Sequence, residues 1–306
     1  PAHAMTFDLS DGSTFIWRYW NLPELQPDTD GTDEDALLNE LESLLEDSVA
    51  RQMTADVPVG ILLSGGVDSS LLTAMAVRHS DKVRTFTIGF PGHHNLDETS
   101  HARLIASKFG TQHVEMASEA PPADLLPALV RQFDEPLVDS SMFPTWLVSN
   151  LVRKHCTVAL GGDGGDELFG GYASYRRLLL MNKRLKHFPI WLRHSVASFA
   201  ERWLPIGLKG RHFLQRLDVD LCSGLPLIAN YFDATARSRL LSGYNAYSFV
   251  AENIYANNVP KQQDLIRRAT QMDFHNYLSE DILVKVDRTS MLNSLELRAP
   301  FLDKRV

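Results

Sequence analysis

An apolar run that stops abruptly at a glycine-rich turn constrains the fold of this chain more than any other feature. Residues 57–63 are Val-Pro-Val-Gly-Ile-Leu-Leu, residues 64–70 are Ser-Gly-Gly-Val-Asp-Ser-Ser, and a helical pattern begins at Asp68. This order predicts a buried strand that leads into a helix through a loop with very little side-chain bulk. The backbone N–H groups of such a loop attract an anion, and Gly65 and Gly66 allow it to approach closely. We interpret the loop as a phosphate site rather than an ordinary turn with capping serines.

The loop differs from two common nucleotide-binding motifs. No lysine follows its glycines, as in Gly-x-x-x-x-Gly-Lys-[Ser/Thr], and their spacing is not Gly-x-Gly-x-x-Gly. Hydroxyl donors come from Ser64, Ser69 and Ser70, whereas the Asp68 carboxylate suits Mg²⁺ rather than phosphate. The pattern resembles the pyrophosphate-binding loop (PP-loop) of the N-type ATP pyrophosphatases. That resemblance implies cleavage of ATP to AMP and pyrophosphate, not to ADP.

Helices and strands are expected to alternate between residues 34 and 160. Apolar periodicity predicts helices at 37–49, 101–109, 124–133 and 145–155, and strands at 83–90, 111–116 and 156–160. The fold class is therefore α/β, with a parallel sheet flanked by helices on both faces. Ligands of such sheets bind beyond the carboxyl ends of the strands. Because Ser64 and Gly161 each follow a strand, we expect them at the same sheet edge.

A second glycine-rich segment follows the last of these strands. Residues 161–172 contain six glycines and three acids. Carboxylates beside a polyphosphate repel it unless a cation lies between them, and Mg²⁺ binds both kinds of oxygen. We expect Asp68 and Asp166 to hold Mg²⁺ and Asp163 to lie near the reacting centre. A calcium loop is the competing interpretation, but the repeat Asp-x-Asp-x-Asp-Gly is missing here.

Composition narrows the class of protein but not its function. The net charge is −8 and no basic block occurs, so we expect neither a nucleic-acid partner nor a membrane partner. Cys156 and Cys222 are too few for a disulfide framework, which favours a reducing, cytoplasmic location. No apolar stretch reaches the roughly 20 residues that a membrane-spanning helix needs.

Several ordered motifs together resemble the glutamine-dependent asparagine synthetase family. They lie at residues 64–70, 134–140, 161–172, 277–291 and 294–303. The resemblance covers nearly the whole chain and implies an adenine nucleotide alpha hydrolase-like (PP-loop) fold with a mostly helical C-terminal part. β-Lactam synthetases and lasso-peptide cyclases share this scaffold, so the acceptor carboxylate stays open at this point.

The resemblance also implies roles for individual residues. It places adenine and ribose near Leu62, Leu63 and Ile88, and Gly162 near the α-phosphate. It places Asp163 beside an acyl-adenylate and makes Asp163, Asp166 and Lys285 catalytic candidates. The full set of expected ATP-binding residues is Leu62, Leu63, Ser64, Gly65, Gly66, Asp68, Ser69, Ser70, Ile88, Gly161 and Gly162. One departure stands out, because Gly161 replaces the serine that the family usually has.

The implied reaction forms an amide at the expense of ATP. The aspartate side-chain carboxylate is adenylated with Mg²⁺ present, and ammonia derived from glutamine then attacks to give asparagine. Another carboxylate-adenylating enzyme of the same scaffold is one alternative, and a nucleotide-binding pseudo-enzyme is another. The sequence leaves the oligomeric state open, with a homodimer among the options.

The chain divides into three expected regions. Residues 1–24 contain two short strands, at 5–9 and 15–19, and resemble the last hairpin of a glutaminase-like domain that is otherwise absent. Residues 25–33 form an acidic linker. Residues 34–306 form the synthetase domain, with a helical subregion from about 176 to 306, and they are expected to lack the family's C-terminal lid.

Three further features allow two interpretations each. Lys285 and Arg288 either approach phosphates or form buried ion pairs with Asp287 and Glu296. The basic residues between 176 and 186 suggest nucleic-acid binding, but a solvated helix face is favoured. His113 is expected to be structural rather than catalytic.

Overall fold

The chain folds into two units, which we describe one at a time. Unit 1 comprises Pro1–Pro136, Ser140–Gly161 and Val286–Val306, and unit 2 comprises Leu137–Asp139 and Gly162–Lys285. The computed structural model describes residues 2–23, 33–89, 97–117, 124–135, 137, 139–226, 236, 239–240, 250–260 and 264–306.

A parallel sheet forms the centre of unit 1. Its strand order is β5-β4-β3-β6-β7, and every neighbouring pair is parallel. The strands are β3 (Val59–Leu62), β4 (Arg84–Gly89), β5 (Gln112–Ala117), β6 (Val158–Leu160) and β7 (Glu296–Arg298). The predicted parallel α/β sheet is thus confirmed. Only β7 was not foreseen, since three residues are too few to show a strand periodicity.

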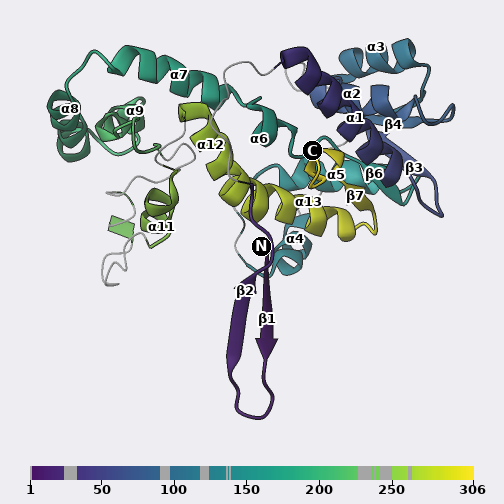
Figure 1. Cartoon of the computed structure of the whole chain (residues 1–306), viewed down its shortest axis with the longest axis horizontal. Helices are drawn as coiled ribbons and strands as arrows, with labels where there is room; N and C mark the ends of the chain where they lie inside the picture. Colours follow the sequence, from purple (N-terminus) through teal and green to yellow (C-terminus); the bar gives the residue numbers. More distant parts are fainter. Residues whose placement is uncertain are drawn as a thin grey trace. The chain divides into compact units, whose positions relative to one another are not determined.

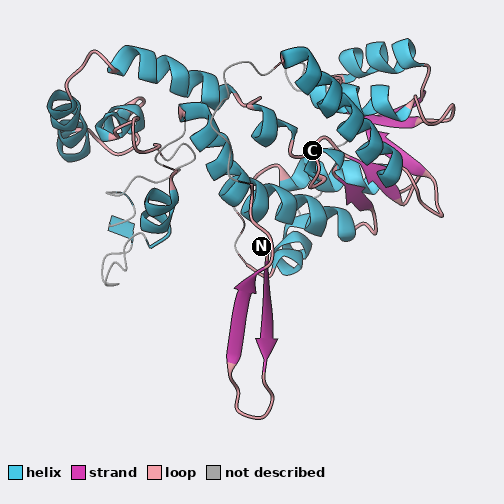
Figure 2. Cartoon of the chain, viewed as in Figure 1, coloured by secondary structure: helices cyan, strands magenta, loops and turns pink. Residues whose placement is uncertain are grey.

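Helices cover both faces of this sheet. Leu62 and Leu63 are consecutive and therefore point to opposite faces. Leu62 packs with Phe86 in one buried cluster, whereas Leu63 packs with Ala102 in another. The helices of unit 1 are α1 (Glu34–Gln52), α2 (Val67–Ala76), α3 (Thr99–Phe109), α4 (Leu125–Phe133) and α5 (Met142–Val152), and a short 3₁₀ turn follows at Pro300–Leu302 (Figure 2).

The N-terminal residues form the predicted hairpin. Strands β1 (His3–Phe7) and β2 (Thr14–Arg18) pair antiparallel, with His3 opposite Arg18 (Figure 1). Both begin one or two residues earlier than the apolar alternation suggested. That these strands belong to a glutaminase-like domain remains a prediction. Of the expected linker 25–33, only Asp33 is described, and its side chain caps the N-terminus of α1.

Unit 2 is helical, as predicted for the C-terminal part of the chain. Its buried core brings together Tyr175, Leu178, Leu265 and Met272 with other apolar residues. Among the described residues, no helix is long and apolar enough to cross a membrane. The helices are α6 (Gly165–Phe169), α7 (Ala173–Leu185), α8 (Ile190–Trp203), α9 (Arg211–Gln215), η2 (Arg216–Asp218), α11 (Val250–Asn258), α12 (Leu265–Asp273), the π-helical η3 (Phe274–Ile282) and α13 (Leu283–Met291), which continues into unit 1.

Candidate functional site

Two serines hold the loop between β3 and α2 in shape. The Oγ atoms of Ser64 and Ser69 lie 3.0 Å apart, and the Ser64 N–H donates to Ser69 Oγ at 3.2 Å. The Gly66 N–H in turn donates to Ser64 Oγ at 3.1 Å. These bonds fix the loop directly before the N-terminus of α2, where backbone N–H groups favour an anion. The predicted phosphate loop is therefore a defined turn and not an irregular segment.

Gly65 is required at its position for two reasons. Its φ is +84°, a left-handed conformation that side chains other than glycine rarely adopt. A Cβ atom there would also lie 2.6 Å from the backbone nitrogen of Ala102 in α3. The loop therefore depends on glycine both for its turn and for the close approach of α3.

The expected nucleotide residues of unit 1 meet at one edge of the sheet. Leu62 pairs with Phe86 and Ile61 pairs with Leu160, so β3, β4 and β6 all point the same way. Ser64 and Gly161 follow two neighbouring strands, and Ile88 lies near the end of a third. The prediction that the two loops begin at the same carboxyl edge is confirmed.

Some backbone groups at this edge form hydrogen bonds to neighbouring strands of the sheet. The Leu63 N–H donates to Phe86 O at 2.8 Å, and the Leu63 carbonyl accepts a hydrogen bond from the Thr87 hydroxyl. The Gly161 N–H donates to Arg298 O at 2.8 Å. Because their N–H groups form hydrogen bonds within the sheet, Leu63 and Gly161 are poorly suited to bind phosphate through the main chain.

Two further loop residues lie in the first turn of α2. Asp68 is half-buried there, at the helix end that favours negative charge on a ligand or side chain. The Ser70 hydroxyl is buried and has no hydrogen-bond partner among the described residues. A buried hydroxyl without a partner carries a desolvation cost, so it is a ready donor or acceptor for a bound group.

In unit 2, the second glycine-rich loop holds Asp166 against the backbone. The N–H groups of Gly170 and Gly171 both donate to the Asp166 carbonyl, at 2.9 and 3.1 Å. A Cβ on Gly171 would overlap the Asp166 carboxylate, so only glycine leaves room for that side chain. Burial raises the pKa of Asp166. The loop thus keeps a carboxylate in a partly desolvated position.

We expect Gly171→Ala to destabilise the protein by about 1–3 kcal/mol, the usual cost of overpacking. The new methyl group has to displace the Asp166 side chain. In an Asp166→Ala background the added cost should nearly vanish, because the clashing carboxylate is gone. Urea unfolding of the four proteins of this cycle measures the coupling. A cost that is equal in both backgrounds would show that the two residues do not compete for space.

Glu167 and Tyr172 form a second contact within this loop that the sequence did not reveal. The Tyr172 hydroxyl donates to the buried Glu167 carboxylate. Burial raises the pKa of Glu167, and this hydrogen bond opposes the rise. Tyr172 also packs against Tyr277 of η3, with ring centroids 6.0 Å apart. These contacts support a structural role for Glu167, which holds Tyr172 where its ring packs on η3.

Lys285 lies among carboxylates of unit 2. Its Nζ is 2.7 Å from Asp139 Oδ2, and the two side chains are only 10% and 15% exposed. Asp281 lies one helical turn earlier, and burial raises its pKa, with the charge of Asp139 adding to the rise. Burial likewise raises the pKa of Asp163, and the positive charge of Lys285 opposes it. Lys285 is thus the cation of a buried acidic cluster that includes the expected catalytic Asp163.

Asp139 and Asp281 had no role assigned from the sequence. The spacing of Asp281 and Lys285, four residues apart in a helical stretch, is a signal that was available. Asp139 lies far from Lys285 in sequence, at a separation of 146 residues, and no local pattern links them. The ion-pair interpretation of Lys285 is therefore supported, with Asp139 as the partner that the structure shows, whereas pairs with Asp287 or Glu296 stay a prediction.

Arg288 binds a helix end in unit 1. Its guanidinium donates to the carbonyls of Gln132 and Phe133, at 3.0 and 2.8 Å, and pairs with Asp134 at 2.9 Å. The carbonyls at the end of α4 lack partners within the helix, and a cation there also suits the helix dipole. These contacts support a structural role for Arg288 rather than a phosphate contact.

His113, which was expected to be structural, lies on β5 and is half-buried. Its Nδ1 lies 2.9 Å from the Thr85 hydroxyl. Glu115 Oε1 is 3.7 Å from Nε2, which is too long for a hydrogen bond. Burial lowers the pKa of His113, and the charge of Glu115 opposes this only in part. Burial therefore favours the neutral form of the ring.

This shift makes stability depend on pH in a defined direction. Below pH about 6.5, His113 is protonated more readily in the unfolded chain than in the folded one. The free energy of unfolding therefore decreases as the pH is lowered. We expect His113→Gln to reduce the slope of unfolding free energy between pH about 7 and about 5.5. An identical slope in wild type and His113→Gln would contradict this assignment.

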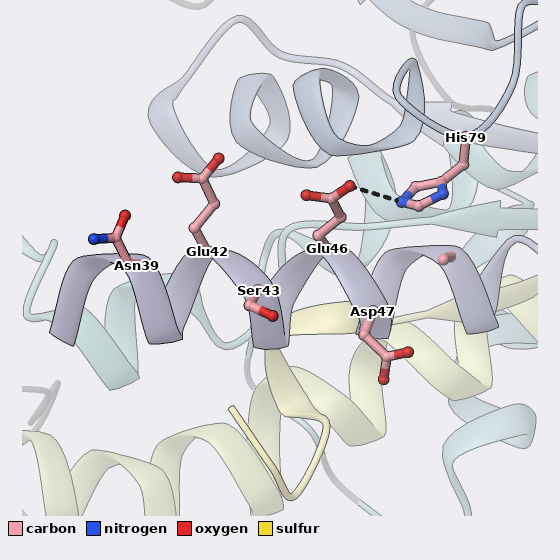
Figure 3. Close-up of a pocket in the computed structure, with 7 residues that line it drawn as sticks. Asn39, Glu42, Ser43, Glu46, Asp47 and His79 are labelled. Carbon is pink, nitrogen blue, oxygen red and sulfur yellow. Dashed lines mark ion pairs between the residues drawn. The ribbon is translucent and has the colours of Figure 1, made fainter. Parts of the chain in front are cut away.

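A separate hollow lies along α1 of unit 1 (Figure 3). Its acids are already neutralised, since Glu42 and Glu46 pair with Arg78 at 2.7 Å and Asp47 pairs with Arg51 at 2.7 Å. Its other polar residues are Asn39, Ser43 and His79, and His79 Nε2 lies 3.3 Å from Glu46 Oε1. None of the expected site residues lines it, and we assign it no binding role.

Comparison with known proteins gives a consistent answer. Residues 40–306 match the sequence model of the family described as asparagine synthase. The chain is similar to Bacillus subtilis asparagine synthetase (glutamine-hydrolyzing) 1, at 35% identity over 90% of this chain and 43% of that protein. A Mycobacterium tuberculosis protein provisionally named asparagine synthetase (glutamine-hydrolyzing) is 37% identical over 92% of this chain and 43% of its own length. The chain thus spans less than half the length of these relatives. It belongs to the asparagine synthase family.

Proposed function

We propose that the protein catalyses ATP-dependent amide formation of the asparagine synthetase type. The observation that carries the proposal is the serine-closed loop 64–70, which shares one sheet edge with Gly161 and Ile88. Such a loop offers N–H and hydroxyl donors to phosphate oxygens without a lysine. Membership of the asparagine synthase family supports the same activity.

ATP would bind along this edge, with its pyrophosphate part at Ser64, Gly65, Gly66 and Ser69. Asp68 and Asp166 would hold Mg²⁺, which neutralises charge on the phosphates when bound. Among the described residues, no three or more His, Cys, Asp or Glu side chains form a protein-only metal site. A Mg²⁺ site fits the residues present, because this ion usually takes one or two carboxylates together with phosphate oxygens and water.

The chemistry takes place in two balanced steps. An oxygen of the aspartate side-chain carboxylate attacks the α-phosphorus, pyrophosphate leaves, and an acyl-adenylate forms. Ammonia then attacks the acyl carbon, AMP leaves with the bonding electrons, and Asp163 accepts a proton from the nitrogen. Burial raises the pKa of Asp163, which makes it a stronger base than an exposed carboxylate. The positive charge of Lys285 opposes this rise of the Asp163 pKa and so favours the anionic form of the base.

The partners follow from the same proposal. Aspartate or a related carboxylate is the acceptor, and a glutaminase-like domain, to which residues 1–24 belong, supplies ammonia from glutamine. The reaction takes place in the cytoplasm, and a homodimer is one arrangement to be tested by mass measurement in solution.

Exchange of labelled pyrophosphate into ATP tests the first step. We expect exchange to require both Mg²⁺ and aspartate, because pyrophosphate can re-enter ATP only from an acyl-adenylate. Exchange supported only by a peptide or another carboxylic acid would indicate a cyclase-like or β-lactam synthetase-like enzyme. ATP binding without exchange for any carboxylate would indicate a pseudo-enzyme and would overturn the proposal.

A further inference from the structure

One side of α8 presents aromatic rings to solvent. Trp191, Phe199 and Trp203 are 66%, 56% and 74% exposed. Their spacings of eight and four residues place them along one side of the helix, and we name them the aromatic stripe. The other side of α8 buries Ala197 and Ala200 and packs on α9 and η2 (Figure 1). No described residue covers the stripe, so three large rings stay in water unless something binds them.

The segment of the chain that carries the aromatic stripe is rich in positive charge. Residues 173–216 contain ten Lys and Arg residues but a single acid, Glu201, although the whole chain carries a net charge of −8. Most of these cations are exposed. The exposed ones are Arg176, Arg177, Lys183, Arg184, Lys186, Arg202 and Lys209. An anionic partner therefore fits this surface, and the partner must also accept apolar rings.

We propose that α8 and the basic end of α7 bind the surface of an anionic lipid bilayer. Tryptophan and phenylalanine prefer the boundary between lipid headgroups and acyl chains, where a helix can lie in the membrane plane. Lysine and arginine beside such a helix interact with anionic headgroups, and this attraction weakens with salt. The stripe supplies the rings, and Lys183, Arg184 and Lys186 supply the charges.

Two other occupants fit less well. A second copy of the chain in a two-fold interface would bring this basic surface against itself, and like charges repel. A single-stranded nucleic acid needs cations interleaved with its stacking rings. On α8, however, Arg202 is the only exposed cation among the rings, and the other exposed cations lie outside the helix.

This inference departs from the expectation, based on net charge, that the protein has no membrane partner. Net charge averages over the chain and hides a local excess of cations. Interfacial binding also needs no membrane-spanning helix, so it agrees with the absence of one among the described residues. The proposal is independent of the proposed catalytic activity.

Co-sedimentation with vesicles tests the proposal. We expect the protein to pellet with vesicles of equal parts phosphatidylglycerol and phosphatidylcholine, and to be released by high salt. It should stay in solution with pure phosphatidylcholine. The variant Trp191→Ser/Phe199→Ser/Trp203→Ser should bind the anionic vesicles at least about tenfold more weakly. A matched hairpin variant, Phe7→Ser/Phe15→Ser/Trp17→Ser, removes three exposed rings elsewhere and should bind as the wild type does.

A charge variant provides a second test of the proposal that does not depend on correct folding of the stripe variant. Lys183→Glu/Arg184→Glu/Lys186→Glu changes only exposed side chains and should also lose at least about tenfold in affinity. Equal binding to neutral and anionic vesicles would overturn the proposal, as would loss of binding in the hairpin variant alone. If the stripe variant turns a wild-type dimer into a monomer and neither binds vesicles, the stripe is an interface between copies. Binding of single-stranded RNA without vesicle binding would likewise overturn the proposal.

Discussion

Asp166→Ala lowers the rate of Mg²⁺-dependent pyrophosphate release by at least about a thousandfold in the proposed mechanism. The variant removes a carboxylate that occupies the space left by Gly171, in a loop whose backbone is fixed by hydrogen bonds from Gly170 and Gly171 to the Asp166 carbonyl. Without it, the charge that develops on the transferred phosphorus is less well neutralised. Asp68→Ala should have an effect of similar size, because it removes the other expected Mg²⁺ ligand. Steady-state release of pyrophosphate from ATP with aspartate and ammonium measures both.

Asp56→Ala is the matched control, since Asp56 is exposed and outside both loops. It should leave the rate within about twofold of the wild type, as expected for a surface change away from the site. Circular dichroism of each variant separates loss of folding from loss of chemistry. Near-normal turnover in a folded Asp166→Ala or Asp68→Ala variant would contradict the metal assignment.

Lys285→Met is the second change with a large expected effect, and its effect is on stability. It leaves Asp139 buried without the cation that lies 2.7 Å away. Removal of one partner of a buried ion pair typically costs about 3–5 kcal/mol, because the other charge stays desolvated. We therefore expect the free energy of unfolding to fall by about 3 kcal/mol. Urea unfolding, monitored by circular dichroism, gives the value.

A second variant identifies the cause. Lys285→Met/Asp139→Leu removes both charges and should recover most of the lost stability. Arg267→Met is the control for an exposed pair, since Arg267 and Asp264 lie 3.1 Å apart but are 36% and 55% exposed. It should cost less than about 1 kcal/mol. An equal loss for Lys285→Met and Arg267→Met would show that burial of the Lys285 pair has no special role.

The central sheet was predictable because its signals are local. β3 and β6 are apolar runs next to glycine, and β4 is rich in β-branched and aromatic residues. The alternation of helices and strands makes a parallel sheet the expected arrangement. β7 was not predicted because its three residues form a strand only through pairing with β6. Hairpin strands were placed within two residues, since apolar alternation alone does not locate where pairing ends.

The two glycine-rich loops were predictable as well, because a required conformation or close approach selects the residue type. Gly65 and Gly171 illustrate this, since a Cβ would meet α3 in one case and Asp166 in the other. The partners of Lys285 were not predictable, because Asp139 is distant in sequence and only folding brings it close. The exposed rings of α8 show the same limit, since the sequence does not reveal which side of a helix faces solvent.

Phosphorus NMR of Mg-ATP mixed with the protein, aspartate and ammonium tests the central claim most directly. The proposed reaction predicts that AMP and pyrophosphate signals grow together, only when aspartate is present, while asparagine accumulates. Appearance of ADP and inorganic phosphate would contradict cleavage at the α-phosphate. Growth of AMP and pyrophosphate without any need for aspartate would contradict aspartate as the acceptor.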